Sequence, residues 1–363
     1  MRIRQKAVLF IVLVQLLFVT LVSGQDQSRR EIRFPDILGY KTLKCDFHMH
    51  TVFSDGSVWP TVRVEEAWRE GLDAIAITDH IEYQPHDKDV PTNHGRSQEI
   101  ASGRAREADI LMPKSTEITR STPPGHFNAL FVDDINLLDT EEFLDAVEAA
   151  NKQNAFVFWN HPGWKPEFKG WFDVHTTLYE NKWLHGIEVA NGDSYYPEGH
   201  QWCLEKNLTM MGNSDIHQPS MSHETSAENH RTMTLVFVEQ RSLAALKDAL
   251  MKGRTAVWYK NQLIGREKYL DAIFKKSVEI GKPYERRKET IWVKITNSAD
   301  IDIDMERAGT QGPVQLKLPA NTTTILKTKI EETAEQAKLS YRVKNFLVAP
   351  EKGLPVDLRI DLQ

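Results

Sequence analysis

The sequence predicts an α/β protein, a barrel of parallel strands followed by a small all-β sandwich. Short apolar runs alternate with helix-like segments over residues 42–259, which is the pattern of β-α units in a parallel sheet. About seven such units favour a closed barrel over a small open sheet. Beyond residue 289, helix-like stretches become scarce and short alternating runs are separated by turn residues, as in a sandwich.

Each element follows from local composition. Helices are expected where polar and apolar residues mix at helical spacing, and Pro60 and Gly71 mark the two ends of the first helix. These helices are residues 60–71, 96–109, 140–153, 198–206 and 242–252. Barrel strands are expected at short apolar runs: 42–47, 73–78, 110–118, 126–132, 155–159, 186–190, 209–212, 231–238 and 254–259. Sandwich strands are expected at 290–297, 314–318, 322–327, 339–343 and 356–362.

The N-terminus has the form of a signal peptide. Arg2, Arg4 and Lys6 precede an apolar run at residues 7–22, and small residues follow it. We expect cleavage after Gly24 and an exported protein, periplasmic or secreted, without membrane contact after cleavage. The alternative is an uncleaved anchor, but the apolar run is short for a spanning helix. The expected organisation is a signal peptide at 1–24, a barrel domain at 37–283, a charged connector at 284–289 and a β-sandwich at 288–363.

Composition limits the partners. The formal net charge of −6 gives no support to nucleic-acid binding. Export permits disulfides, yet the chain has only Cys45 and Cys203. Both lie in structured segments, so we expect two buried free thiols, with a bridge as the alternative. Nothing in the sequence indicates the oligomeric state.

The segment DFHMHTVFSDG, residues 46–56, is the first candidate site. His48 and His50 alternate at the end of an expected strand, so both rings point to one side. Two imidazoles beside Asp55 repel one another unless a divalent cation binds them. The pair predicts part of a metal site.

Other residues of metal-ligand type occur at the ends of later expected strands. In a parallel barrel these ends meet on one face, where active sites form. Residues far apart in the sequence are therefore expected at a single site. They are His80, Glu117, His126, His161, Glu188, Asp215 and His217.

Together these motifs resemble the PHP (polymerase and histidinol phosphatase) superfamily. The resemblance rests on DFHMHTVFSDG, AITDH, STEIT followed by GHFNALFV, FVFWNHPG and GNSDIHQP. It implies a distorted (β/α)7 TIM-like barrel that binds two or three divalent metals. One metal is assigned to His48, His50, Glu117 and Asp215, a second to Glu117, His126 and His161, and a third to Asp55, His80 and His217. The layout also resembles exported bacterial PHP-type phosphodiesterases.

The expected function is metal-dependent hydrolysis of a small phosphoester, by attack on phosphorus of hydroxide held between metals that share Glu117. Zn²⁺, Mn²⁺ or Fe²⁺ suits the ligand set. Asp215 or His217 is expected to manage a proton. A phosphodiester is favoured. The alternatives are a phosphomonoesterase of the histidinol-phosphatase type, a nuclease, which the negative charge disfavours, and a non-catalytic exported metal-dependent binding protein.

Several residues are expected to play supporting parts. Asp46, Asp79 and Asn213 neighbour the ligands and would support them, and Glu188 would orient a ligand or line the pocket. The loop at residues 82–97 and several aromatic residues are candidates for the pocket wall: Trp59, Trp164, Trp171, Tyr195 and Tyr196. Most of six other histidines are expected at the surface: His86, His94, His175, His185, His200 and His230.

Overall fold

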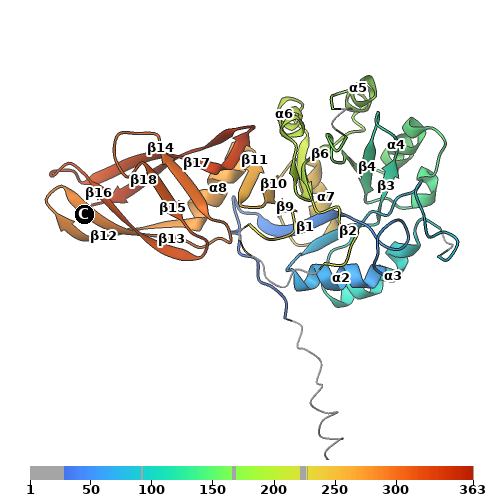
Figure 1. The fold of residues 1–363 in the computed structure, drawn as a ribbon, viewed down its shortest axis with the longest axis horizontal. Coiled ribbons are helices and arrows are strands. Elements are labelled where there is room, and N and C mark those ends of the chain that lie inside the picture. The colour runs from blue at the N-terminus through green and yellow to red at the C-terminus, as the bar shows by residue number, and fades with distance from the viewer. Residues whose placement is uncertain (1–27, 91–92, 166–168, 221–225, 227, 363) are drawn as a thin grey trace, which may run out of the picture.

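The computed structural model describes residues 28–90, 93–165, 169–220, 226 and 228–362 (Figure 1). The chain forms two lobes along its long axis. The larger lobe holds the N-terminal part of the chain, coloured blue to yellow, and the smaller lobe holds the C-terminal strands in orange and red. The expected signal peptide lies outside the described residues.

Strands and helices alternate in the larger lobe much as the apolar runs indicate. Its strands are β1 (Lys41–Met49), β2 (Ala74–Ile77), β3 (Ser115–Thr119), β4 (His126–Leu130), β5 (Phe156–Trp159), β6 (Gly186–Asn191), β7 (Ser194–Tyr195), β8 (Thr209–Asn213), β9 (Met233–Val238), β10 (Thr255–Tyr259) and β11 (Gln262–Gly265). Its helices are α2 (Pro60–Arg69), α3 (Arg96–Glu107), η1 (Ile135–Leu138), α4 (Phe143–Lys152), α5 (Asp173–Glu180), α6 (Pro197–Glu205), α7 (Leu243–Met251) and α8 (Glu267–Ser277). Strand β11 and helix α8 lie beyond the elements expected in this lobe.

Strand directions differ from those of a regular parallel barrel. Strand β1 pairs parallel with β2, and β6 pairs parallel with both β5 and β8. Strand β4, however, is antiparallel to β3 and β5, and β9 is antiparallel to β1. Residues 120–125 between β3 and β4 are too few for a crossover helix, so the chain returns in the opposite direction. The mixed α/β class is observed, whereas the regular (β/α)7 alternation is not confirmed.

Isolated bridges connect the two sheets of the larger lobe at one edge. His80 pairs with Glu117, and Met49 pairs with Ile216 after β8, both in parallel. Because β4 is antiparallel to β3, its first residue, His126, lies opposite the end of β3. Residues that end β1, β2, β3 and β8 and the residue that begins β4 thus meet at one edge.

The smaller lobe consists of strands. They are β12 (Val278–Arg287), β13 (Thr290–Asn297), β14 (Ile303–Arg307), β15 (Gln315–Leu318), β16 (Thr322–Lys329), β17 (Gln336–Ala349) and β18 (Lys352–Asp361). The segment 284–289, expected as a connector, lies instead in the β12–β13 hairpin, where Arg287 pairs with Thr290. Strand β12 is at the edge of its sheet, where charged residues are favoured. Its composition is therefore as charged as that of a linker.

The two lobes share a sheet and a core. Strand β11 pairs parallel with β17, so a nine-stranded sheet runs from one lobe into the other. Trp258 and Leu270 of the larger lobe belong to the same buried cluster as Tyr341 and Leu358 of the smaller lobe. Main-chain hydrogen bonds and apolar contacts both join the lobes.

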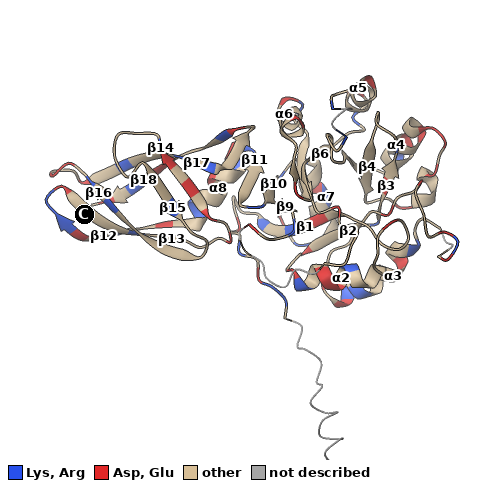
Figure 2. Cartoon of the chain, viewed as in Figure 1, with Lys and Arg blue, Asp and Glu red and all other residues tan. Residues whose placement is uncertain are grey.

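Other expectations concern the whole chain. Cys45 and Cys203 are buried free thiols, as expected. Positions of Lys and Arg are interspersed with those of Asp and Glu along the ribbon of both lobes (Figure 2). In the part of the chain that the structure describes, no helix is both long and apolar enough to cross a membrane.

Candidate metal centre

The nine residues that the sequence indicated as metal ligands gather at one edge of the larger lobe. Strand β1 contains His48, β3 contains Glu117 and β4 begins with His126. The others lie in the connections that follow β1, β2, β5 and β8: His50, Asp55, His80, His161, Asp215 and His217. Their donor atoms form four overlapping groups, and within each group the atoms lie within 4.8 Å of one another.

Two carboxylates face the histidines of the first motif. His48 Nε2 lies 2.9 Å from Glu117 Oε2 and 3.2 Å from Asp215 Oδ1. His50 Nε2 lies 3.3 Å and 3.0 Å from the same two oxygens. The four residues that the resemblance assigns to one metal thus converge, and all are buried except Asp215, whose side chain is 20% exposed.

The second expected group is divided between the two carboxylates. His126 Nδ1 lies 2.7 Å from Glu117 Oε1, on the other oxygen of that carboxylate. His161 faces Asp215 instead, with its Nε2 atom 3.9 Å from Asp215 Oδ2. Glu117 and Asp215 are therefore both placed to be shared between neighbouring cations.

The third group surrounds Asp55. Its Oδ1 atom lies 3.1 Å from His217 Nε2 and 3.3 Å from His80 Nε2. His50 joins the group through Nδ1, 3.8 Å from the same oxygen. The aspartate of the SDG sequence thus lies where a third cation would need a carboxylate.

Unpartnered donor atoms show that this cluster fits cations. Four of the described side-chain atoms that are buried without a hydrogen-bond partner of acceptable geometry belong to the cluster: His50 Nε2, Asp55 Oδ1, Glu117 Oε1 and Asp215 Oδ1. A buried polar atom without a partner costs about 1–3 kcal/mol. A divalent cation would supply the missing partner, and imidazole with carboxylate suits Zn²⁺, Mn²⁺ or Fe²⁺.

Two carboxylates and one imidazole of the cluster are held in the forms that bind cations, whereas the neighbouring carboxylates raise the pKa values of His48, His80 and His217. Burial, with the charge of His80 adding to it, lowers the pKa of His50 to about 4. Burial by itself raises the pKa of Glu117 and of Asp215, but the surrounding imidazoles reverse this and hold both pKa values below their usual range. At neutral pH the two carboxylates are therefore ionised and His50 is neutral.

Glu188, which the sequence indicated as a supporting residue, connects several of these groups. Its Oε1 atom lies 2.9 Å from His48 Nδ1 and accepts a hydrogen bond from Asn213 Nδ2 at 2.9 Å. Its Oε2 atom accepts from Asn191 Nδ2 and from the backbone N–H of His161, both at 2.8 Å. Glu188 thus fixes the ring of His48 and the backbone of His161.

Replacing Glu188 by Gln is expected to weaken metal binding by about 10–100-fold, because a ligand histidine loses the carboxylate that orients its ring. Competitive titration with a chromogenic chelator measures the change. Glu205→Gln, on the exposed end of α6, is the matched control and should leave affinity unchanged. Equal affinity in Glu188→Gln and the control would contradict the role assigned to Glu188.

The aspartates beside the ligands stabilise the loops. Asp79 accepts hydrogen bonds from the backbone N–H of Thr51 at 2.7 Å and from Ser54 Oγ at 2.8 Å. Asp46 accepts from the backbone N–H of Ser214 at 3.1 Å. Both residues therefore act on the backbone that positions the ligands.

Two buried arginines were not indicated by the sequence. Arg63 donates to the backbone oxygens of His50 at 2.8 Å and Ile216 at 3.1 Å, so it ties two ligand loops together. Arg231 forms ion pairs with Asp46 at 3.0 Å and Glu70 at 2.8 Å. Each is a single arginine in an amphipathic or apolar segment, and no local pattern marks it as buried.

Two residues of the cluster have a strained backbone. His161 and Asp215 have φ angles of 29° and 53°, in the left-handed region that non-glycine residues rarely adopt. Gly56 is required for a different reason, since a Cβ atom there would lie 2.5 Å from the backbone carbon of His50. Because residue 56 has no side chain, the turn at residues 54–56 can pack directly against the backbone of His50.

The expectation of a surface position is wrong for two of the other histidines. His175 and His200 are buried. His175 stacks on Trp159 with ring centroids 3.8 Å apart and donates from Nε2 to the backbone oxygen of Pro124 at 2.9 Å. His175 lies on α5 and His200 on α6. Both rings are buried by contacts with residues distant in the chain, which the sequence does not reveal.

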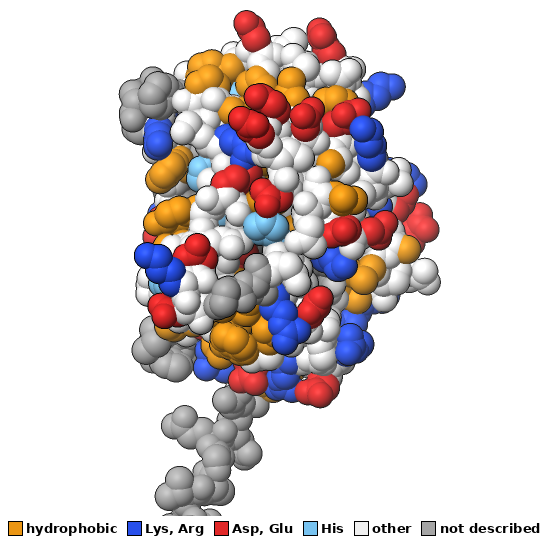
Figure 3. Space-filling model, turned by 90° about the vertical axis from the view of Figure 1, so that its right-hand side faces the viewer, with side chains coloured by type: hydrophobic (Ala, Val, Ile, Leu, Met, Phe, Trp, Pro, Cys, Tyr) orange, Lys and Arg blue, Asp and Glu red, His pale blue; other side chains and the backbone are white. Residues whose placement is uncertain are grey.

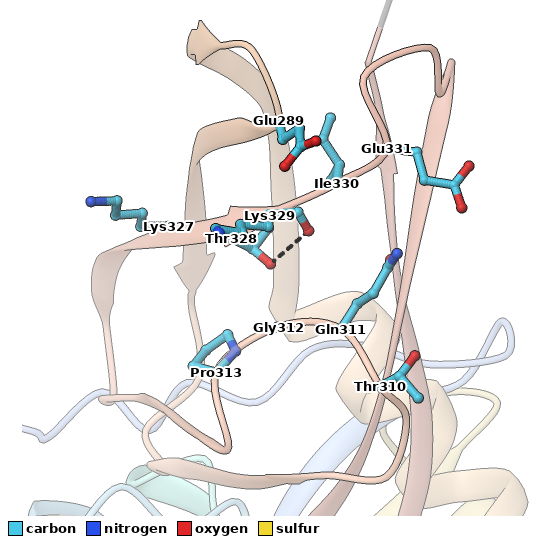
Figure 4. A pocket seen from close by; sticks show the side chains of 10 residues that line it. All are labelled: Glu289, Thr310, Gln311, Gly312, Pro313, Lys327, Thr328, Lys329, Ile330 and Glu331. Atoms are coloured by element: carbon cyan, nitrogen blue, oxygen red, sulfur yellow. Dashed lines mark hydrogen bonds between the residues drawn. The ribbon is translucent and has the colours of Figure 1, made fainter.

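A larger cavity lies away from the cluster. It has a volume of about 540 Å³ and is found in the smaller lobe, between strand β16 and the loop that contains Gly312 (Figure 4). Its charged side chains are Glu289, Lys327, Lys329 and Glu331. Their signs are mixed, so nothing there rivals the metal cluster as a site of chemistry.

An α/β lobe with a buried cluster of histidine and carboxylate side chains at its strand ends is the arrangement found in metal-dependent hydrolases. The chain is similar to a two-domain protein from Bacteroides vulgatus that is described as containing a predicted PHP-like metal-dependent phosphoesterase. The two chains are 45% identical, with a TM-score of 0.88, and the similarity covers 93% of this chain and 100% of the other. The present chain therefore belongs to the PHP-like family of metal-dependent phosphoesterases, which confirms the resemblance seen in its motifs.

Other comparisons add the second lobe and looser likenesses. A family model described as an Ig-like domain matches residues 278–359, which agrees with the start of β12. An amidohydrolase from Chromobacterium violaceum is 16% identical over 48% of this chain and 88% of its own, with a TM-score of 0.38. An inferred metal-dependent phosphoesterase from Bifidobacterium adolescentis is 17% identical over 58% of this chain and 96% of its own, with a TM-score of 0.41. No curated protein matches the chain.

Proposed function

We propose that the protein is an exported phosphodiesterase that hydrolyses small organophosphate diesters with two or three bound cations, Zn²⁺, Mn²⁺ or Fe²⁺. The observation that carries the proposal is the convergence of nine ligand-type residues around Glu117 and Asp215. When bound, such cations polarise the phosphoryl group and activate water.

The chain's own residues divide the remaining tasks. His48, His50 and Glu117 are fully buried and are placed to hold cations. Asp215 and His217 have side chains 20% and 31% exposed, so they can meet both substrate and solvent. One of these two would take the proton of the attacking water or supply a proton to the leaving group.

The diester preference rests on how the nearby arginines are used. Arg63 and Arg231 bond to backbone and to buried carboxylates, and Arg120 pairs with Glu82. These three cations are already engaged and would not cradle a dianionic monoester. A diester carries a single negative charge and needs fewer cationic contacts, so the cations at the cluster would suffice.

A substrate comparison tests the preference. We expect turnover of bis(p-nitrophenyl) phosphate to exceed that of p-nitrophenyl phosphate. A strong preference for the monoester would identify a phosphomonoesterase instead. If neither is hydrolysed while metal remains bound, the non-catalytic binding protein becomes the better proposal.

The role of Asp215 is tested by its amide variant. Asp215→Asn is expected to lower kcat by at least about 10²-fold, because a proton acceptor and a shared charge are both lost. Metal content measured on the same sample separates the two losses. Retention of full metal and full turnover would exclude Asp215 from this role.

The surface and the topology support the remaining proposals. On the face drawn in Figure 3, basic side chains are scattered among acidic ones and form no continuous basic stripe. Nucleic acid would require such a stripe, so this face supports a small-molecule substrate. Strands β1 to β6 and β8 would together form the distorted barrel.

Sequencing the mature N-terminus tests export and the proposed cleavage after Gly24.

A further inference from the structure

We propose that Tyr83 and Trp164 determine substrate specificity by binding the two organic groups of the diester, one on each side of the metal centre. Both groups would then be planar, as in a diaryl phosphodiester. This inference rests on the proposed function and specifies its substrate class.

Trp164 is a large aromatic residue left exposed beside two of the predicted ligands. Its side chain is 58% exposed, and its ring centroid lies 5.8 Å from that of His126 and 5.6 Å from that of His161. With these histidines it lines a shallow hollow of only about 10 Å³, so the surface open to a ligand is the exposed face of the indole and not an enclosed pocket. A planar group attached to phosphorus at the cluster could therefore stack on the indole.

Tyr83 occupies the corresponding position beside another ligand. It follows β2 in the loop that the sequence indicated as a pocket wall, and it is 52% exposed. Its ring lies edge-on to His80 with centroids 6.0 Å apart, and His80 lies 5.9 Å from His126. Tyr83 thus neighbours His80, Trp164 neighbours His126, and these two imidazoles neighbour each other, so two arms from one phosphorus could each reach one aromatic ring.

The chain beside Trp164 makes two further contacts. A Cβ atom on Gly163 would lie 3.2 Å from the ring of Tyr196, so the chain packs tightly just before the indole. Lys165 Nζ lies 5.1 Å from the indole centroid, within cation–π distance.

Two substrates that share the same leaving group distinguish a role in substrate binding from a role in catalysis. They are bis(p-nitrophenyl) phosphate and methyl p-nitrophenyl phosphate, which differ only in the group that stays on phosphorus. Trp164→Ala and Tyr83→Ala will each remove one aromatic surface. At least one of them is expected to raise KM for the diaryl substrate by about 2–10-fold, with kcat little changed and the methyl substrate less affected.

Controls exclude a structural cause. Trp164→Phe and Tyr83→Phe keep an aromatic surface and should restore KM for the diaryl substrate. Tyr284→Ala removes an aromatic residue of similar exposure, 52%, from the smaller lobe and should leave both substrates unaffected. If the two alanine variants change KM for both substrates equally, or change neither, the inference is wrong although the diesterase proposal stands.

Binding measured without turnover provides a second test. Calorimetry should show that Trp164→Ala or Tyr83→Ala weakens binding of diphenyl phosphate but not of diethyl phosphate. Equal weakening of both ligands, with metal content retained, would overturn the assignment. Failure of wild-type protein to hydrolyse any diester would instead remove the proposed function on which the inference rests.

Discussion

Replacing Glu117 by Gln is expected to lower kcat/KM for the phosphoester by at least about 10³-fold and to release metal. Glu117 is fully buried, and its two oxygens lie within 3.4 Å of four imidazoles. A neutral amide of the same shape removes the shared negative charge and turns a donor group toward one of these rings. Metal analysis after dialysis and steady-state kinetics measure the two effects.

The choice of variant makes the Glu117 experiment decisive. Gln has nearly the volume of Glu, so a far-UV circular dichroism spectrum like that of wild type would exclude a folding defect. Glu107→Gln, on the exposed end of α3, is the matched control and should retain metal and turnover. Retention of both by Glu117→Gln would show that this carboxylate is not the shared ligand.

Replacing Arg231 by Met should destabilise the fold by about 3–5 kcal/mol, because two buried carboxylates lose their cation. Arg231 has a side chain 4% exposed and pairs with Asp46 and Glu70, whose side chains are 0% and 9% exposed. Asp46 in turn holds the backbone of Ser214, next to Asp215. Urea unfolding of metal-free protein measures the loss.

A surface pair and a double variant serve as comparisons. Arg241→Met removes an ion pair with Asp109, whose side chain is 86% exposed, and should cost less than about 1 kcal/mol. Adding Glu70→Gln to Arg231→Met should recover part of the loss, because one of the stranded charges is removed. Similar unfolding midpoints for Arg231→Met and Arg241→Met would contradict the structural role of Arg231.

The candidate site was predictable from sequence because its chemistry is local. A metal ligand needs a particular side chain at the end of a strand, and both features are visible in motifs such as DFHMH and AITDH. Glu188 was also indicated, from its place in the apolar run of β6. Arg63 and Arg231 were not indicated, because their partners lie up to 185 residues away in the chain.

The fold was predictable to a similar extent. Hydrophobic period indicates whether a segment is strand or helix, and it identified most elements of the larger lobe. It does not indicate strand direction, so the antiparallel β4 was not anticipated. It also fails at edge strands, where charged residues imitate a linker, as in β12.

By itself, then, the sequence determined the α/β class, the all-β second lobe and the set of nine ligand-type residues. Side-chain chemistry and local period suffice for those. Only the tertiary structure decided how these residues are grouped, with His161 facing Asp215 rather than Glu117 and His50 joining the Asp55 group. The reason is that the grouping depends on distances of a few ångströms between loops that are remote in sequence, and long-range strand pairing and the buried arginines set those distances.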